Sequence, residues 1–525
     1  MSMGKILTAV LVAVAFVGGL QLGKKTGGAA PLITNASSGA SYGGSASVPA
    51  RDSAADGASA VDMAAAKEYR MQGSSKFVAG PPRSDVVVTV NDGQSIQEAV
   101  LAAAPGTTIH VMPGTYSETV YIDKDGIRLI GIIEVSRRAT LNGEGTLNDA
   151  ILFSGNNIVV EGFMITAYKG NAIMSQAGNN FEIRDNIIVD TGVYGIFPQL
   201  GTNGVVEHNV VSGIEDAAIY VGMSDNIHVA FNEVFDSVAG IEIENSRHAI
   251  VESNFVYNNT GGVLAFITPG LPIKTTYDVI IRNNWISDNN TPNFGAPGST
   301  VGGIPAGTGI MIMAADDVVI EGNIITNNKT VGIMTVDHNT AAELTNVTID
   351  PEADPNSDRL MILNNTMHNN GYDTIAEIKG LMLADFKTGN PDIFAIGPSN
   401  GSCIINRHRY VHSGIDDYAE CDFTNTSSIG NYLMPPVEPR VIEPDERGKI
   451  AYLGICAGCH TYEGRMIGPP VKIIQALYME NPHGLAEYIA APVKKREDYP
   501  EMPKQDYLDE ATRLAVAEYM LSVTR

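Results

Sequence analysis

One short pattern recurs through the middle of the chain: an asparagine followed by a brief, mainly hydrophobic segment. It occurs at Asn186, Asn209, Asn232, Asn254, Asn284, Asn323 and Asn365. The first spacings are 23, 23 and 22 residues, the period of one coil of a parallel β-solenoid and too short for a propeller blade. The alternation within each segment predicts short strands, with each asparagine bonded to its equivalent in the next coil. We therefore expect a structural asparagine ladder.

Alignment of the coils separates inward from outward positions. The inward set is Ile173, Ile196, Ile219, Ile241, Val263, Ile310 and Ile333. Strand alternation turns the next residues outward, and the later coils then carry an apolar outer ladder. That ladder is Leu264, Phe266, Met311, Met313, Met334 and Val336. It is too large to face water, so we expect a cover from the insertions at residues 268–277 and 291–308, or from the C-terminal domain.

Two carboxylates share the outward face of one coil. Glu242 and Glu244 stand at i and i+2, beside Tyr220 and Gln199. Paired carboxylates bind a cation or act as acid and base on a sugar. A solvated face, or ion pairs with loops, is the alternative interpretation. Glu242 and Glu244 are the catalytic candidates of the solenoid.

Near its end the chain contains Cys456-Ala457-Gly458-Cys459-His460, a C-x-x-C-H motif. Such a motif forms two thioethers to a haem and supplies an axial nitrogen to its iron. A zinc site needs a second cysteine pair, but the other two cysteines lie 18 residues apart. A thioredoxin-like dithiol needs a βαβ unit, whereas residues 447–453 have a helical pattern. The motif predicts one covalent haem c on Cys456 and Cys459, with His460 as an axial ligand.

The second axial ligand is predicted from chain reach. Met466 follows His460 by only six residues, so it would have to cross to the opposite haem face with almost no loop. Met502 follows His460 by 42 residues and lies between prolines that stiffen its loop. Met502 is therefore the predicted ligand. A haem with His and Met ligands has no open position and exchanges electrons rather than substrates.

The last eighty or so residues resemble a class I cytochrome c. Gly448, Tyr452 and Cys456 match the G-x3-aromatic-x3-C pattern of that family's first helix. Residues 468–470 resemble the family segment whose backbone carbonyl orients the haem-binding histidine, and residues 509–523 resemble its C-terminal helix. The resemblance implies a small all-α haem domain.

Residues 83–435 resemble right-handed parallel β-helix proteins of the pectin-lyase-like and mannuronan-epimerase-like group, and in particular an exported bacterial family that joins such a β-helix to a cytochrome c. The resemblance rests on residues 218–222, 240–246 and 259–262. One departure matters. The Asp-Pro-His-Asp motif of the epimerases is missing, and the nearest segment, residues 194–199, has neither an acid nor a histidine.

Composition and the N-terminus indicate export. The net charge of −25 argues against a nucleic-acid partner, which would require clustered Lys and Arg. Residues 6–22 are apolar and flanked by Lys5 and Lys24, as in a signal peptide or an uncleaved membrane anchor. Haem c is attached outside the cytoplasm, where disulfides persist. We therefore expect a periplasmic or otherwise extracytoplasmic protein, with Cys403 and Cys421 either bridged or two separate buried thiols.

The predicted fold class is mainly β, a right-handed parallel β-helix followed by a small all-α cytochrome c domain. The predicted divisions are residues 1–25 as signal or anchor, 26–82 as flexible linker, 83–435 as β-helix, 436–442 as linker and 443–525 as haem domain. The preferred function is a c-type haem protein that carries electrons to or from a redox partner protein, with the β-helix as docking or substrate-binding body. One alternative is a polysaccharide-active enzyme, lyase or epimerase-like, with an accessory haem domain; another is a non-catalytic binding scaffold.

Overall fold

The computed structural model describes residues 84–296, 299–345, 349–422, 425–426, 446–457, 459–463, 468–496, 499 and 501–524. The predicted signal or anchor and both predicted linkers lie outside these residues. No helix in the described part of the chain is long and apolar enough to cross a membrane. The described residues fall within one compact unit, residues 60–525.

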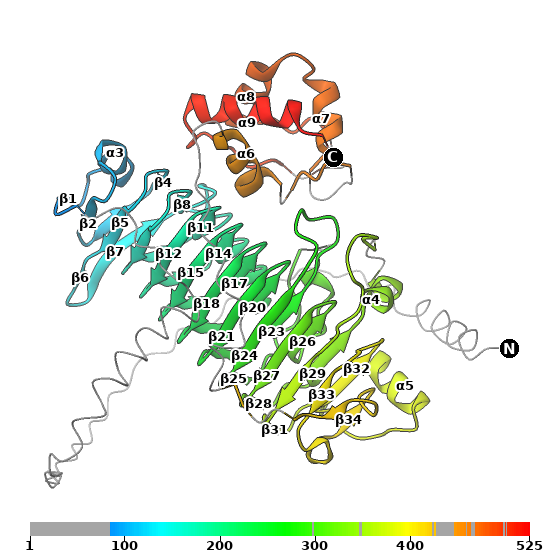
Figure 1. The fold of residues 1–525 in the computed structure, drawn as a ribbon. Helices are drawn as coiled ribbons and strands as arrows, with labels where there is room; N and C mark the ends of the chain where they lie inside the picture. The colour runs from blue at the N-terminus through cyan, green and yellow to red at the C-terminus, as the bar shows by residue number, and fades with distance from the viewer. Residues whose placement is uncertain are drawn as a thin grey trace, which may run out of the picture. The chain divides into compact units, whose positions relative to one another are not determined.

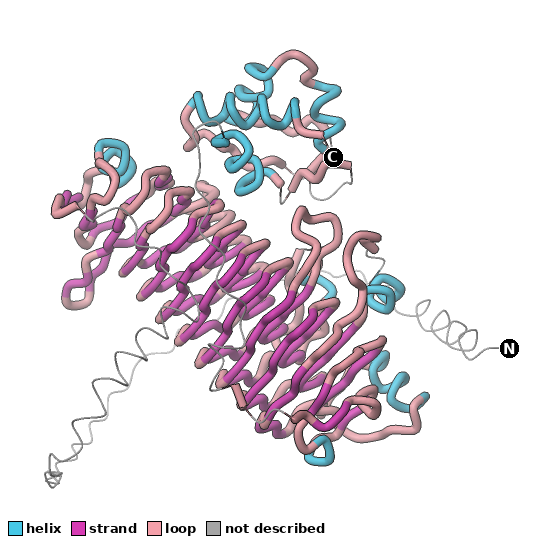
Figure 2. Tube along the Cα trace, in the orientation of Figure 1, coloured by secondary structure: helices cyan, strands magenta, loops and turns pink. Residues whose placement is uncertain are grey.

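In this part of the chain, successive coils stack through parallel strands into three long sheets (Figures 1 and 2). The first sheet, sheet A, has 13 strands in the order β1 (Val87–Val90), β2 (Thr108–Val111), β5 (Arg128–Gly131), β9 (Val159–Glu161), β12 (Asn179–Arg184), β15 (Thr202–Glu207), β18 (Asp225–Ala230), β21 (Arg247–Glu252), β24 (Tyr277–Arg282), β27 (Asp316–Glu321), β30 (Met361–Leu363), β33 (Cys403–Ile404) and β35 (Ala419–Glu420).

The second sheet, sheet B, follows the same axis with strands β3 (Gly114–Tyr116), β7 (Arg137–Asn142), β10 (Met164–Thr166), β13 (Ile187–Val189), β16 (Val210–Ser212), β19 (Glu233–Phe235), β22 (Phe255–Tyr257), β25 (Trp285–Ser287), β28 (Ile324–Thr326) and β31 (Thr366–His368). A short strand, β6 (Ile133–Glu134), pairs antiparallel with β7.

The third sheet, sheet C, has 11 strands among the described residues: β4 (Val120–Ile122), β8 (Ile151–Phe153), β11 (Ile173–Gln176), β14 (Tyr194–Gln199), β17 (Ala217–Gly222), β20 (Ala239–Glu244), β23 (Gly261–Phe266), β26 (Thr308–Met313), β29 (Val331–Val336), β32 (Ile393–Ile396) and β34 (His412–Ser413). Ile196 pairs with Ile173 on one side and with Ile219 on the other, and the register continues to Ile333. The predicted inward set is therefore confirmed, and these residues are fully buried in one hydrophobic core.

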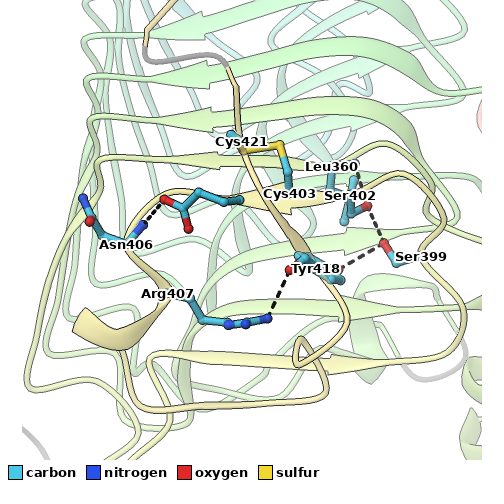
Figure 3. The surroundings of a disulfide bond; sticks show 9 residues. Leu360, Ser399, Ser402, Cys403, Asn406, Arg407, Tyr418 and Cys421 are labelled. Carbon is cyan, nitrogen blue, oxygen red and sulfur yellow. Dashed lines mark hydrogen bonds between the residues drawn. A yellow bond between two sulfur atoms is a disulfide. The ribbon is translucent and has the colours of Figure 1, made fainter.

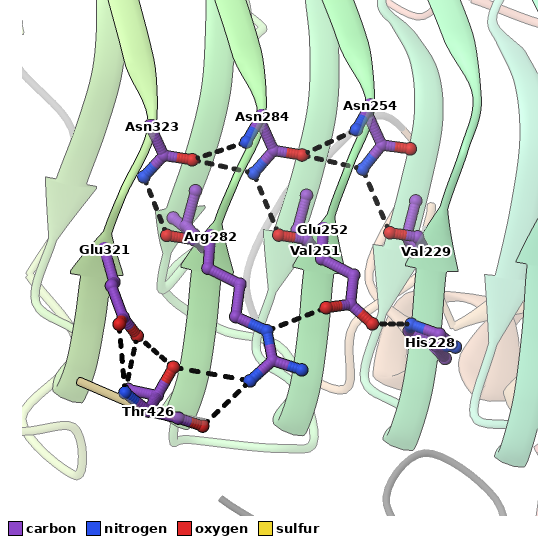
Figure 4. A network of polar contacts seen from close by, with 11 residues as sticks. His228, Val229, Val251, Glu252, Asn254, Arg282, Asn284, Glu321, Asn323 and Thr426 are labelled. Atoms are coloured by element: carbon purple, nitrogen blue, oxygen red, sulfur yellow. Dashed lines mark hydrogen bonds and ion pairs between the residues drawn. The ribbon is translucent and has the colours of Figure 1, made fainter. Parts of the chain in front are cut away.

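The asparagine ladder is confirmed as a continuous chain of side-chain hydrogen bonds. From Asn186 to Asn365, each Nδ2 donates to the next Oδ1 over 2.9–3.0 Å. Each Nδ2 also donates to a backbone carbonyl of an earlier coil, as Asn254 does to Val229, so the buried amides satisfy one another (Figure 4). A second ladder, which we did not predict, joins Asn259, Asn289, Asn328 and Asn370 over 3.0–3.1 Å.

The first coil is closed by a helix. Helix α3 (Ile96–Ala102) buries Ile96 and Val100 in the core, and the Ser95 hydroxyl caps it by accepting a hydrogen bond from the Glu98 amide. The Glu118 carboxylate accepts from the Ile96 and Gln97 amides at the same helix end. Anionic oxygens at a helix N-terminus satisfy its free N–H groups.

The last coils are covered by short helices and tied by a disulfide. The helices are α4 (His338–Thr345), α5 (Ala376–Ala384) and the 3-10 turns η1 (Val301–Gly303) and η2 (Arg407–Arg409). A disulfide joins Cys403 to Cys421 with 4.9 Å between the Cα atoms (Figure 3). Nearby, the Tyr418 hydroxyl donates to Ser399 over 3.0 Å. The disulfide ties β33 to the residue that follows β35, and these are the last two strands of sheet A.

Residues 446–524 are all-α where described. They form α6 (Arg447–Ala451), a π-helical turn η5 (Tyr452–Cys456), α7 (Val471–Leu477), α8 (Pro482–Ala490) and α9 (Glu510–Ser522). A Cβ on Gly448 would collide with the Ala515 carbonyl, so glycine allows α6 and α9 to cross closely. Tyr452 and Tyr519 pack at 5.3 Å between ring centroids across this crossing.

Candidate active site on the outer face of sheet C

Sheet C presents two outward rows of side chains in register. Tyr220 pairs with Glu242 and Glu242 with Leu264; two residues further along, Glu244 pairs with Phe266. Toward the N-terminal coils the rows continue into Phe197 and Gln199. The predicted placement of Glu242 and Glu244 on one outward face, with Tyr220 and Gln199 close by, is therefore confirmed.

The two glutamates are not a solvated pair. Glu242 is 1% exposed and Glu244 is buried as well. The Oε1 atom of Glu242 is buried with no hydrogen-bond partner. Burial of a carboxyl oxygen without a hydrogen-bond partner is unfavourable unless the carboxyl group is protonated or a ligand supplies the partner. The solvated-face interpretation of Glu242 and Glu244 is therefore wrong.

A third carboxyl group joins them. Asp216, in the turn before β17, interacts electrostatically with both Glu242 and Glu244. Burial, reinforced by the charge of Glu244, raises the pKa of Asp216 to about 7. Burial raises the pKa of Glu242 well above its usual value, and the nearby Asp216 and Glu244 add to this effect. The ionised form of Glu242 is therefore disfavoured.

Glu244 has a different environment. Burial raises its pKa, but hydrogen bonds with Thr268 and Tyr220 oppose the shift by favouring the ionised form. Two carboxyl groups on one face thus differ in environment: neighbouring carboxylates oppose ionisation of Glu242, whereas hydrogen bonds favour ionisation of Glu244. Such a division suits an acid and a base.

Three aromatic rings lie next to these acids. Tyr194 and Phe197 each stack on Tyr220 with 4.5 Å between ring centroids, and Tyr194 lies 4.6 Å from Phe197. Burial and the surrounding carboxylates raise the pKa of both tyrosines, so their hydroxyls stay protonated and can donate hydrogen bonds. An apolar surface with a few convergent polar groups is typical of a small-molecule or sugar site.

The predicted cover over the apolar outer ladder comes largely from insertions. Val301 and Ile304, from the insertion at residues 291–308, join one hydrophobic cluster with Leu264 and Phe266. Ile378 and Met382 of α5 extend the cover to the later coils. The insertion at residues 268–277 contributes Thr268, which hydrogen-bonds Glu244.

The C-terminal helical residues also contact this face. Tyr507 packs against Tyr121, with 6.0 Å between ring centroids, and hydrogen-bonds Gln176. Ile450 and Leu453 belong to one cluster with Leu200.

The predicted haem residues Cys456, Cys459 and His460 lie within one backbone turn, in which the Cys459 and His460 amides both donate to the Cys456 carbonyl. Cys456 and Cys459 are free thiols, and burial raises their pKa values to about 12 and about 11, so they are not thiolates. The Nδ1 atom of His460 is hydrogen-bonded to the Pro469 carbonyl over 2.8 Å. Burial lowers the pKa of His460, which favours the neutral ring that an iron ligand requires.

Met502 is partly buried against the cluster that contains Cys456, whereas Met466 lies outside the described residues. The donor set and the fixed imidazole fit a covalent haem.

Comparison with known proteins bears on the β-helix. A family model described as right handed beta helix region matches residues 136–234 and 232–349. Together with the parallel sheets, this match shows that the fold is a right-handed parallel β-helix. No curated protein sequence matches the chain.

Three similar solved structures illustrate the fold. The A-module of a mannuronan C-5 epimerase from Azotobacter vinelandii is 14% identical, with 64% of this chain and 87% of the module covered and a TM-score of 0.40. An alginate lyase from Paenibacillus sp. is 14% identical, with 60% and 100% covered and a TM-score of 0.42. The pectate lyase Pel9A is 13% identical, with 69% and 91% covered and a TM-score of 0.37.

These findings correct the preferred function. We expected first of all an electron carrier, but the similar structures are polysaccharide lyases and epimerases. The prediction of an electron carrier is therefore wrong, and the polysaccharide-active alternative agrees better. Haem attachment on Cys456 and Cys459 does not depend on that function. It needs few protein ligands, because a porphyrin supplies four iron ligands itself, and it stays a prediction.

Proposed function

We propose that the β-helix is a polysaccharide-active enzyme whose active face is the outer surface of β17 and β20. One observation carries the proposal: Glu242 is a buried carboxyl group with an unpartnered oxygen, held between Asp216 and Glu244. Perturbed carboxyl groups in mutually different environments are a mark of acid–base sites. The stacked rings of Tyr194, Phe197 and Tyr220 would support a sugar beside them.

The proposal places the enzyme outside the cytoplasm. The disulfide between Cys403 and Cys421 supports this location, because such bonds persist in oxidising compartments. Export through residues 6–22 is part of the same proposal.

We also propose an accessory haem in the helical part, bound through Cys456 and Cys459, with His460 and Met502 as axial ligands. The hydrogen bond between His460 and Pro469 supports it, because it fixes the ring orientation that ligation needs. When bound, the group would supply one-electron chemistry, which sugar cleavage does not require. Haem staining on a denaturing gel should be positive after expression with cytochrome maturation and negative for Cys456→Ala combined with Cys459→Ala. A colourless wild-type protein would remove this part of the proposal.

The enzymatic proposal is tested by incubating the full chain with a broad panel of polysaccharides. New reducing ends, unsaturated products and epimerised residues should be followed together. Glu242→Gln should abolish the product that wild type forms. Glu215→Gln is the matched control, because Glu215 is exposed in the same turn as Asp216. Binding without any product would instead favour a non-catalytic scaffold.

A further inference from the structure

Among the residues that the structure describes, no cation contributes to the pKa shifts of the acids on sheet C. The interactions that shift the pKa values of Asp216, Glu242 and Glu244 involve one another, Tyr220 and Thr268, and none involves a Lys, Arg or His. The outward rows around them are equally free of cations, from Met174 and Gln176 to Met334 and Val336. The face is therefore acidic and uncompensated.

This absence is specific to sheet C. On the outward side of sheet A, Glu252 lies 2.7 Å from both His228 and Arg282, and Arg184 lies 3.0 Å from Glu161. The same solenoid thus places cations beside carboxylates on sheet A, whereas no strand residue on the outward rows of sheet C around the candidate acids is a cation.

The charge of a substrate decides whether such a face can bind it. A uronate would bring its own carboxylate next to Glu244, and like charges at short range in a buried site repel strongly. Proton removal beside a uronate carboxylate also builds negative charge, which preorganised cations or donors must stabilise. An uncharged sugar brings no carboxylate that Glu244 would repel, and its hydrolysis needs no such stabilisation of negative charge. Its hydroxyls can pair with Gln176, Gln199 and the tyrosine hydroxyls, while its C–H faces pack on the rings.

Resting on the function proposed above, we propose that the face of sheet C takes an uncharged polysaccharide and hydrolyses its glycosidic bond, with Glu242 as acid and Glu244 as base. The unpartnered Oε1 of Glu242 points to a missing hydrogen-bond partner, and the glycosidic oxygen fits that role. Glu244 is the better base because Tyr220 and Thr268 hydrogen-bond its side chain.

The reaction balances with water as the co-reactant. The Glu242 proton passes to the glycosidic oxygen as the bond from that oxygen to the anomeric carbon breaks. Water forms the new bond to that carbon and gives a proton to the Glu244 carboxylate. One sugar leaves as an alcohol and the other as a reducing end, and solvent returns the proton from Glu244 to Glu242.

The test compares substrates that differ only in charge. Native polygalacturonan and its carboxyl-reduced, neutral form share one backbone, and neutral glucans, mannans, xylans and fructans extend the panel. With the full chain, neutral polymers should release reducing ends without ultraviolet absorbance from unsaturated uronates. Glu242→Gln should lower kcat by about a hundredfold or more, Glu244→Gln should do the same, and Glu215→Gln should leave kcat unchanged. Thermal unfolding of each variant shows whether it is folded.

The outcomes separate the two proposals. Cleavage of acidic polymers with unsaturated products, or their epimerisation, would overturn the neutral-substrate inference and leave a polysaccharide-active enzyme in place. Absence of any product across the panel would overturn both.

Discussion

Two faces of one solenoid bury carboxylates, and they do so in opposite ways. On sheet A, Glu252 is hydrogen-bonded by His228 and Arg282, and Arg282 also contacts Thr426, which donates its amide to Glu321 (Figure 4). Burial alone would raise the pKa of Glu252, but these two partners lower it to about 2. On sheet C, Glu242 has an unpartnered oxygen, no cation of the described part of the chain lowers its pKa, and that pKa rises.

The difference separates a structural carboxylate from a chemical one. On sheet A each carboxylate oxygen of Glu252 has a cationic partner, which favours the ionised form and leaves no proton to transfer. An uncompensated acid destabilises its ionised form and holds a proton that it can transfer.

The largest expected effect is loss of activity in Glu242→Gln. The amide keeps the shape of the side chain but has no transferable proton, so product formation should fall by about a hundredfold or more. Its melting temperature should stay the same or rise, because a neutral group replaces one that is costly to ionise. A product assay together with thermal unfolding checks both; a variant that melts lower and keeps its activity would make Glu242 structural.

Glu252→Gln should lower stability and leave activity unchanged, which is the reverse of the result expected for Glu242→Gln. Loss of the charge weakens the hydrogen bonds with His228 and Arg282 and leaves a partly buried guanidinium without its anion, so unfolding free energy should drop by about 2–3 kcal/mol. Activity per folded molecule should not change. Denaturant unfolding measures the free energy of unfolding, and the product assay measures activity. If Glu252→Gln were as stable as wild type, the proposed difference between sheets A and C would be contradicted.

A smaller effect concerns pH. The pKa of Asp216 rises from 3.8 to about 7 in the fold. The stability that this group contributes is therefore fully present below about pH 3.8 and is lost as the pH rises through about 7. Relative to Asp216→Asn, wild type should lose unfolding free energy over this window. For Glu252 the order is opposite, since its contribution is lost as the pH falls toward about 2. Identical pH profiles for wild type and Asp216→Asn would contradict the assignment.

The smallest effect is expected for Tyr220→Phe. Loss of the hydroxyl removes a hydrogen bond that lowers the pKa of Glu244. The acid limb of the pH–activity profile should move to higher pH, with only a few-fold loss at the optimum. Phe255→Tyr is the control, because Phe255 is exposed on sheet B. An unshifted acid limb in Tyr220→Phe would show that Glu244 is not the base.

Much of this architecture could be predicted because each coil of a solenoid repeats the same strand pairing and the same pattern of buried residues. The period predicted the coils, and the alternation predicted which side of each strand faces the core. The second asparagine ladder was missed although its signal was present: Asn254, Asn284, Asn323 and Asn365 are each followed five residues later by another asparagine. A repeat in register with a known ladder predicts a second one.

The site was only half predictable. Strand alternation placed Glu242 and Glu244, but not their burial, because the cover comes from insertions without a period, such as Val301 and Ile304. Asp216 was missed because it lies in a turn. Coil alignment could have found it, since the equivalent positions hold Val193, Val238, Thr260, Gly307 and Thr330, and Asp216 alone is charged. Electrostatic coupling across coils depends on distances that no spacing supplies.

The most direct measurement is the protonation state of Glu242 in the folded full chain at neutral pH. Infrared difference spectroscopy between wild type and Glu242→Gln should show a carbonyl band of a protonated carboxylic acid that only the wild type has. Its disappearance in the variant is the predicted result. A wild-type spectrum in which Glu242 contributes only carboxylate bands would contradict an acid poised for proton transfer on this face.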